Sequence, residues 1–165
     1  MSEVRQYTTE EVIPLIIQWH HDRNLIEGST DEAQCLKLLS EVGEVADNVA
    51  KGRSPIDDIG DCMVVLLNIM ERNQLSLQGI VDAREYDYGG DTEEYLVFSL
   101  ARDIGQWGVS EMFIDLEDLC SIYDQLVVLA TLHNLTLDQC LSHAYNDIKD
   151  RKGKMVNGVF VKDIQ

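Results

Sequence analysis

Two segments with helical periodicity, separated by only a few residues, constrain the fold of this chain most. Apolar side chains recur at helical spacing over residues 30–51, where Ser29 and the glutamate three positions later have the spacing of a capping box. Gly52 is typical of the residue that follows a helix, and Pro55 suits the first turn of the next one, over 56–70. Such a short connection makes the helices antiparallel neighbours. A helical hairpin is therefore predicted.

Each predicted helix carries two acidic residues three positions apart. Glu41 and Glu44 share one face of the first helix, and Asp58 and Asp61 share one face of the second. One interpretation is that both faces are ordinary solvated surfaces of an acidic protein. The repetition on adjacent helices favours a second interpretation, because four crowded carboxylates repel one another unless a cation is bound. All-oxygen ligands favour Mg²⁺ or Mn²⁺ over zinc.

The two acid pairs, Glu-x-x-Glu and Asp-x-x-Asp, also resemble the signature of the MazG-like all-α nucleoside triphosphate pyrophosphohydrolases. That family is related to the dimeric dUTPases and to phosphoribosyl-ATP pyrophosphohydrolase. Residues 19–25 resemble the first helix of short, phage-type members, and residues 144–162 resemble their C-terminal segment. The resemblance covers residues 10–78 and 116–163. It implies an all-α, MazG-like helical bundle that hydrolyses (deoxy)nucleoside triphosphates to nucleoside monophosphate and pyrophosphate.

The resemblance also implies roles for the acids. Glu41, Glu44, Asp58 and Asp61 would be both the catalytic residues and the ligands of Mg²⁺ or Mn²⁺, and one of the glutamates would also accept a proton from the attacking water. Asp58 stands where the family has glutamate, and the neighbouring Asp57 could share its role. A dUTPase-like or other specialised diphosphohydrolase is an alternative on the same scaffold.

The residues expected to bind the nucleotide come from both ends of the chain. By resemblance, the segment that begins at Trp19 would line the nucleobase pocket, although a tryptophan there is also explained as a core or interface aromatic. Residues 149–154 hold four of the 13 Lys and Arg residues, which could clamp phosphates or simply complement a helix C-terminus. The predicted substrate-binding residues are Trp19, His20, Asn24, Lys37, Asn146, Lys149, Arg151 and Lys152.

The amino-acid composition limits the classes of molecule that the chain can bind. The 165-residue chain has 13 Lys and Arg against 30 Asp and Glu, a net charge of −17, which repels nucleic acid and anionic membranes. A free triphosphate would be repelled too, so a nucleotide enzyme of this charge needs a divalent metal and a local basic patch. A non-enzymatic alternative is an acidic decoy that binds a basic or nucleic-acid-binding protein. Without a signal sequence or a long apolar run, a single cytoplasmic domain is expected.

The second part of the chain echoes the first. Residues 102–107 resemble 40–45, and 117–121 resemble 57–61, although shared helix-turn chemistry could produce the same pattern. We therefore predict a decayed internal duplication, with a catalytic half over about 8–83, a linker over 84–91 and a degenerate half over about 92–163. The positions equivalent to the four acids are Asp103, Gln106, Asp118 and Ser121. Each chain would stand in for two subunits of a simpler relative, and a homodimer of such chains is possible.

Overall fold

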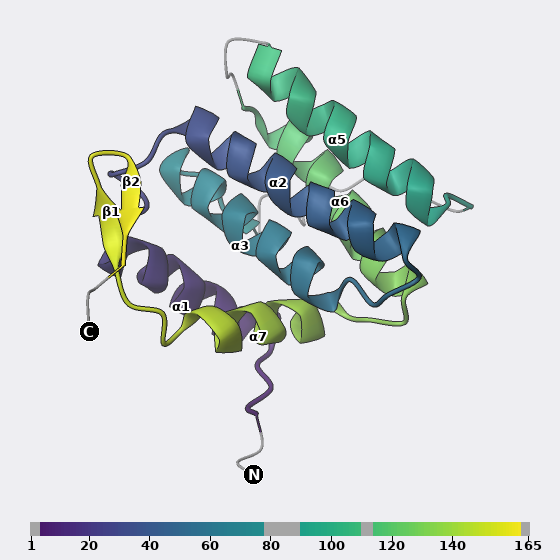
Figure 1. The fold of residues 1–165 in the computed structure, drawn as a ribbon, viewed down its shortest axis with the longest axis horizontal. Helices are drawn as coiled ribbons and strands as arrows, with labels where there is room; N and C mark the ends of the chain where they lie inside the picture. Colours follow the sequence, from purple (N-terminus) through teal and green to yellow (C-terminus); the bar gives the residue numbers. More distant parts are fainter. Residues whose placement is uncertain (1–3, 78–89, 110–113, 163–165) are drawn as a thin grey trace.

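The computed structural model describes residues 4–77, 90–109 and 114–162 of the chain. In these ranges it is a bundle of α-helices with one small antiparallel sheet, so the predicted all-α bundle is confirmed (Figure 1). None of the described helices is long and apolar enough to cross a membrane. The helices are α1 (Thr9–Asp22), α2 (Asp31–Ala50), α3 (Ile56–Arg72), α5 (Glu93–Val109), α6 (Leu116–Leu132) and α7 (Leu137–Ile148). The strands are β1 (Lys154–Val156) and β2 (Val159–Val161).

The predicted hairpin is formed by α2 and α3, but its first cap differs from the expectation. Thr30, rather than Ser29, is the N-cap of α2, and its side-chain oxygen accepts a hydrogen bond from the backbone N–H of Ala33. Ser29 is buried instead, and its hydroxyl accepts from the side chain of Gln34 at 2.7 Å. Either of the two consecutive hydroxyl residues could have capped the helix. Thr30 does so, and the Ser29 hydroxyl binds Gln34 in the first turn of the helix instead.

Helix α3 is the centre of the molecule, because it packs against α1, α2, α6 and α7. Its closest approach is to α7, at Gly60. A Cβ atom at this position would lie 2.3 Å from the carbonyl oxygen of Cys140 and 2.8 Å from the Cβ of Ala144. The glycine therefore lets α7 lie directly on α3, and α7 leads into the C-terminal hairpin of β1 and β2 (Figure 1).

The hairpin of α5 and α6 repeats several features of the first one. Each bound of α6 lies 60 positions after the corresponding bound of α3. Both helices end in the same way: Gln74 and Asn134 adopt positive φ angles of 57° and 56°, and the next residue in each case donates to a carbonyl in the last turn at 2.9 Å. A duplication would produce this pattern. Most of the predicted linker, 84–91, lies outside the described residues, and the duplication stays a prediction.

Candidate nucleotide site

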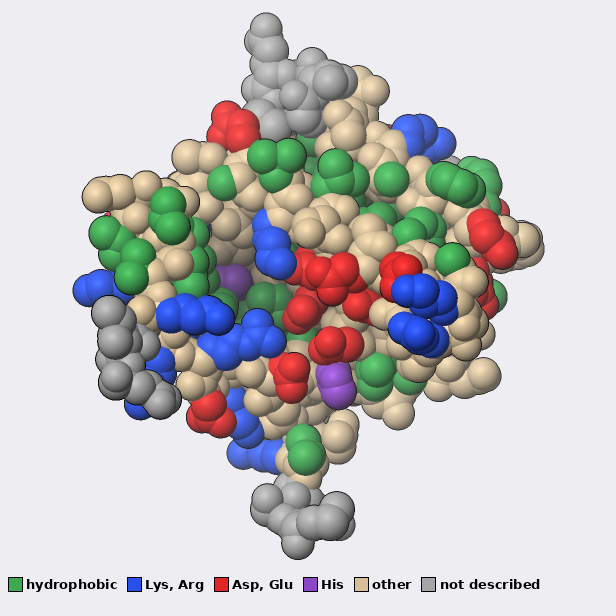
Figure 2. Space-filling view, in the orientation of Figure 1, with side chains coloured by type: hydrophobic (Ala, Val, Ile, Leu, Met, Phe, Trp, Pro, Cys, Tyr) green, Lys and Arg blue, Asp and Glu red, His purple; other side chains and the backbone are tan. Residues whose placement is uncertain are grey.

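A cavity of about 680 Å³ opens between α1, α2, α3 and the C-terminal segment. Figure 2 shows it as a hollow with acidic side chains gathered to its right and basic side chains beside and below it. Its inner wall is mainly apolar. The lining residues are Trp19, His20, Leu25, Ser29, Ala33, Gln34, Lys37, Glu41, Asp61, Val64, Val65, Asn68, Ile148, Arg151, Lys152, Met155, Phe160 and Lys162.

The four predicted acids all act electrostatically on one buried thiol. The side chain of Cys62 is fully buried, and the negative charges of Glu41, Asp61, Asp58 and Glu44 all act on it, adding to the effect of burial in raising its pKa well above the ordinary value. Glu41 and Asp58 are themselves 3% and 5% exposed, whereas Glu44 is exposed to solvent. Of the four acids, Glu41 and Asp61, one from each helix, line the cavity.

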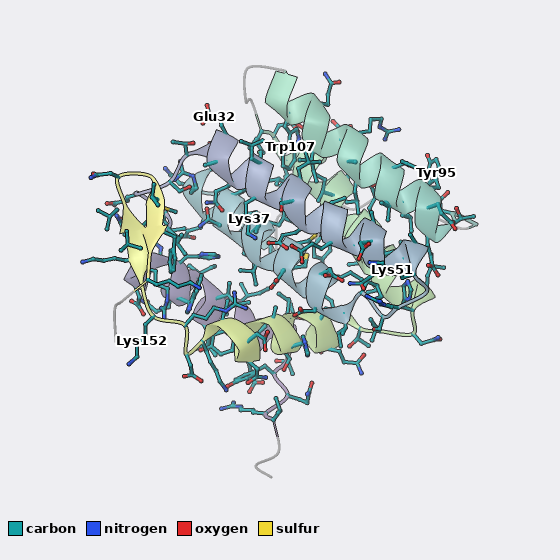
Figure 3. All side chains as sticks on the ribbon, in the orientation of Figure 1. Glu32, Lys37, Lys51, Tyr95, Trp107 and Lys152 are labelled. Carbon is teal, nitrogen blue, oxygen red and sulfur yellow. The ribbon has the colours of Figure 1, made fainter. Side chains whose placement is uncertain are left out.

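Two of these carboxylates already have partners. Lys37 forms an ion pair with Glu41 one turn away on α2, and Figure 3 shows this lysine near the middle of that helix. The side chain of Asn48 donates to Asp58 at 2.6 Å. Within the described ranges, no three acidic, histidine or cysteine side chains form a ready-made metal site. A metal held by these acids would therefore have to replace the present partners of Glu41 and Asp58.

The ionisation of Asp61 is strongly disturbed. Burial, followed by the negative charges of Glu41 and Asp57, raises the pKa of Asp61 to about 6, while Arg151 and Lys37 act in the opposite direction. The charge of Asp61 is thus coupled to both the acidic and the basic sides of the cavity. Asp57 itself lies 3.4 Å from the imidazole of His143 on α7, and it does not line the cavity.

The basic side of the cavity comes from the C-terminal segment. Arg151, Lys152 and Lys162 line it together with Lys37, so four of the 13 Lys and Arg residues of the chain surround this one space. Lys162 was not predicted. It follows β2, and only the folding-back of the hairpin brings it next to residues ten positions earlier.

The two strands also add an apolar wall that sequence analysis missed. Met155 of β1 pairs with Phe160 of β2, and both side chains line the cavity. The other residues of both strands are exposed. Three-residue strands carry too little alternation to be recognised in a sequence, although two glycines, at 153 and 158, punctuate this hairpin.

Arg23 of the turn after α1 fastens this segment to the rest of the molecule. Its guanidinium lies over the ring of Trp19, 4.7 Å from the centroid, and donates to the carbonyl of Arg151 at 2.9 Å. The Arg23 carbonyl accepts from the backbone N–H of Met155 at 2.8 Å. Asn24, predicted to bind substrate, does not line the cavity and instead donates to the carbonyl of Met155 at 3.1 Å. Both residues hold the hairpin in place.

Two other residues predicted to bind substrate, Asn146 and Lys149, do not line the cavity either. The ammonium of Lys149 donates to the side-chain oxygen of Asn146 at 2.7 Å, and the Asn146 amide donates to the carbonyl of Arg5 at 2.8 Å. Because α7 ends at Ile148, the residues that follow do not continue its faces. The cationic cluster divides into two lysines outside the cavity lining, Lys149 and Lys154, and two cations inside it, Arg151 and Lys152.

Trp19 and His20 line the cavity but are also tied to their neighbours. The indole N–H of Trp19 donates to the carbonyl of Ile148 at 2.9 Å, which joins α1 to α7. Burial lowers the pKa of His20 to about 4, so the imidazole is neutral at pH 7. Its Nε2 lies 3.0 Å from the carbonyl of Val64, and its Nδ1 lies 3.3 Å from the amide nitrogen of Asn68.

The equivalent place in the second hairpin has a different chemistry. Asp103 of α5 accepts hydrogen bonds from Ser121 at 3.1 Å and Gln125 at 2.7 Å, both on α6, and forms an ion pair with Arg102. Asp103 and Ser121, the predicted equivalents of Glu41 and Asp61, are therefore in contact. Only Asp103 of this pair is an acid, and neutral donors and an arginine already satisfy it, so the pair does not reproduce the two carboxylates of Glu41 and Asp61.

Comparisons with known proteins identify a phage relative. An uncharacterized 18.2 kDa protein from the rep-hol intergenic region of Haemophilus phage HP1 is 41% identical over 68 residues, which are 40% of this chain and 42% of that protein. The alignment thus spans less than half of either chain. No protein-family model matches this chain, and no solved structure matches it.

Proposed function

We propose that this protein is a MazG-like nucleoside triphosphate pyrophosphohydrolase that depends on Mg²⁺ or Mn²⁺. The observation that carries the proposal is the division of one cavity into three chemically different regions. Carboxylates lie at one edge, four cations surround the opening, and an apolar and aromatic wall lies inside. These regions match the metal, the phosphates and the base of a nucleotide, and a volume of about 680 Å³ falls in the range of small-molecule sites.

The charge distribution supports a polyphosphate ligand. The chain carries −17, so its surface as a whole repels anions, yet Lys37, Arg151, Lys152 and Lys162 lie around this single space. An arginine binds phosphate oxygens with two parallel hydrogen bonds, and lysines add point charges. We propose that Arg151 and the three lysines bind the phosphates, whereas Trp19, Met155 and Phe160 enclose the base.

The acids fit a hard divalent cation by their chemistry, since all four supply oxygen. Glu41, Glu44, Asp58 and Asp61 would hold the metal, and to do so Glu41 would exchange its present partner, Lys37, for the cation. A bound metal would lower the pKa of the attacking water and neutralise charge that develops on the phosphates. One of the two glutamates would accept the proton of that water. Lys37, once released from Glu41, is free to contact a phosphate.

A hydrolysis assay over all ribo- and deoxyribonucleoside triphosphates, with the products separated, tests the proposal. We expect nucleoside monophosphate and pyrophosphate in Mg²⁺ and no turnover in EDTA. Release of orthophosphate would indicate attack elsewhere on the chain of phosphates and would redefine the reaction. The absence of turnover with every nucleotide in both Mg²⁺ and Mn²⁺ would refute the proposal.

A further inference from the structure

The chain between α7 and β1, residues 149–153, contains two cations of the cavity but no helix or strand. It passes beside the end of α1, where Arg23 follows the helix (Figure 1). Nε and Nη2 of Arg23 both donate to the carbonyl oxygen of Arg151, at 2.9 and 2.5 Å. One guanidinium group thus binds the backbone of Arg151 through two hydrogen bonds.

Trp19 orients this guanidinium group. The centre of the guanidinium lies 4.7 Å from the centroid of the Trp19 ring, and the indole N–H donates to the carbonyl of Ile148, the last residue of α7, at 2.9 Å. A guanidinium stacked on an aromatic face carries its N–H groups in a fixed fork at the edge of the plane. The direction of the two hydrogen bonds to Arg151 is therefore set by packing rather than by the flexible stem of Arg23.

The side chain of Arg151 is held only loosely by its own contacts. Its one ion pair among the described residues is with Asp147 at 3.8 Å, and both side chains are more than half exposed, so the pair contributes little. Arg151 nevertheless lines the cavity, and its positive charge acts on Asp61. The backbone position of Arg151 therefore determines which part of the cavity its guanidinium can reach.

We infer that Arg23 is a positioning residue, which fixes the backbone at Arg151 so that the Arg151 guanidinium meets the phosphates of a bound nucleotide. This inference rests on the proposed function and names a residue on which the phosphate contact depends. Arg23 itself does not line the cavity and acts through Arg151. Because a guanidinium binds phosphate oxygens in a defined geometry, a displacement of about 1 Å can cost about 10²-fold in rate.

The test is a double-mutant cycle with Arg23→Met and Arg151→Ala, followed by steady-state kinetics on the best nucleoside triphosphate. Methionine keeps an unbranched side chain that packs on the indole of Trp19 but has no donors. We expect Arg23→Met to lower kcat/KM at least about fivefold. In the Arg151→Ala protein, the same change should cost less than about twofold, since the side chain that Arg23 positions is gone.

Asn24→Gly is the matched control for a purely structural role. The Asn24 side chain also binds the C-terminal hairpin, at the carbonyl of Met155, but makes no contact with Arg151. Its φ angle of 53° is one that glycine adopts without strain, and the backbone hydrogen bond from Met155 to Arg23 does not depend on this side chain. We expect kcat/KM of Asn24→Gly to stay within about twofold of the parent.

The outcomes distinguish the two proposals. If Arg23→Met costs the same factor with and without Arg151, or if Asn24→Gly loses as much, Arg23 only holds the hairpin and the inference is refuted while the enzyme remains. If the parent hydrolyses no nucleotide, the proposed function is refuted and this inference with it. Circular dichroism establishes that each variant is folded. If Arg23→Met is not, Arg23→Lys replaces it, with an expected loss of at least about threefold that falls below about 1.5-fold in the Arg151→Ala protein.

Discussion

Gly60→Ala tests the contact that places the C-terminal segment at the cavity. The added methyl carbon would stand 2.3 Å from the carbonyl oxygen of Cys140, where ordinary contacts are 3.4 Å or more, so α7 must move by roughly 1 Å relative to α3. Overpacking of this kind costs about 1 to 3 kcal/mol. Alanine also favours the helix by about 1 kcal/mol compared with glycine. Because the clash involves backbone, we expect a net loss of about 1 to 2 kcal/mol in the free energy of unfolding.

Gly43→Ala is the matched control. Gly43 lies on the exposed side of α2, and a Cβ there meets no atom within 4 Å. Only the helix propensity should change, which stabilises the protein by about 0.5 to 1 kcal/mol. Urea denaturation followed by circular dichroism measures both variants against the parent. If Gly60→Ala is as stable as Gly43→Ala, the close approach of α7 to α3 is not as described.

Further expectations concern titration, phosphate binding and turnover. The stability that neutral His20 contributes is fully present above about pH 6.5 and is lost as the pH falls towards its folded pKa of about 4. The pKa of Asp61 is raised from 3.8 to about 6, so protonation of Asp61 stabilises the folded protein as the pH falls through that interval. Asp61→Asn should therefore lose stability more steeply than the parent below pH 6 in acid-dependent urea denaturation, and parallel curves would contradict the raised pKa of Asp61. Arg151→Ala should raise KM or lower kcat/KM at least about tenfold while Lys149→Ala changes either less than about twofold, and steady-state kinetics with equal effects would argue against the cavity as the phosphate site. Asp61→Asn should also lower kcat at least about 10²-fold, whereas Asp103→Asn should stay within about threefold of the parent; normal turnover in Asp61→Asn would show that the acids are not catalytic.

Local patterns in the sequence were sufficient to predict the first hairpin and to place the two acids of each pair on one face of their helix. Helical period and end signals are properties of neighbouring residues, and spacing by three places side chains on one face wherever the helix packs. The same signals could not decide between Ser29 and Thr30 as the cap. That choice depended on whether a glutamine in the following turn could take the serine as its partner.

The composition of the cavity depended on contacts between distant parts of the chain. In the sequence, Lys149 and Arg151 are two cations of the same cluster. In the structure, α7 ends just before them, Lys149 donates to Asn146, and Arg23 binds the backbone carbonyl of Arg151. Asn68 lies among apolar residues of a buried helix, and the partners of its amide nitrogen, His20 and Leu25, are on other elements. Periodicity contains no information about such partners.

Binding of Mn²⁺, followed by electron paramagnetic resonance in the parent, Asp61→Asn and Asp103→Asn, tests the central claim most directly. The claim is that the acids of the first hairpin, and not those of the second, form a metal site beside the nucleotide cavity. We expect the parent and Asp103→Asn to bind Mn²⁺ equally and Asp61→Asn to bind at least about tenfold more weakly, since one charged ligand is lost. Equal binding by all three proteins, or a loss confined to Asp103→Asn, would contradict it.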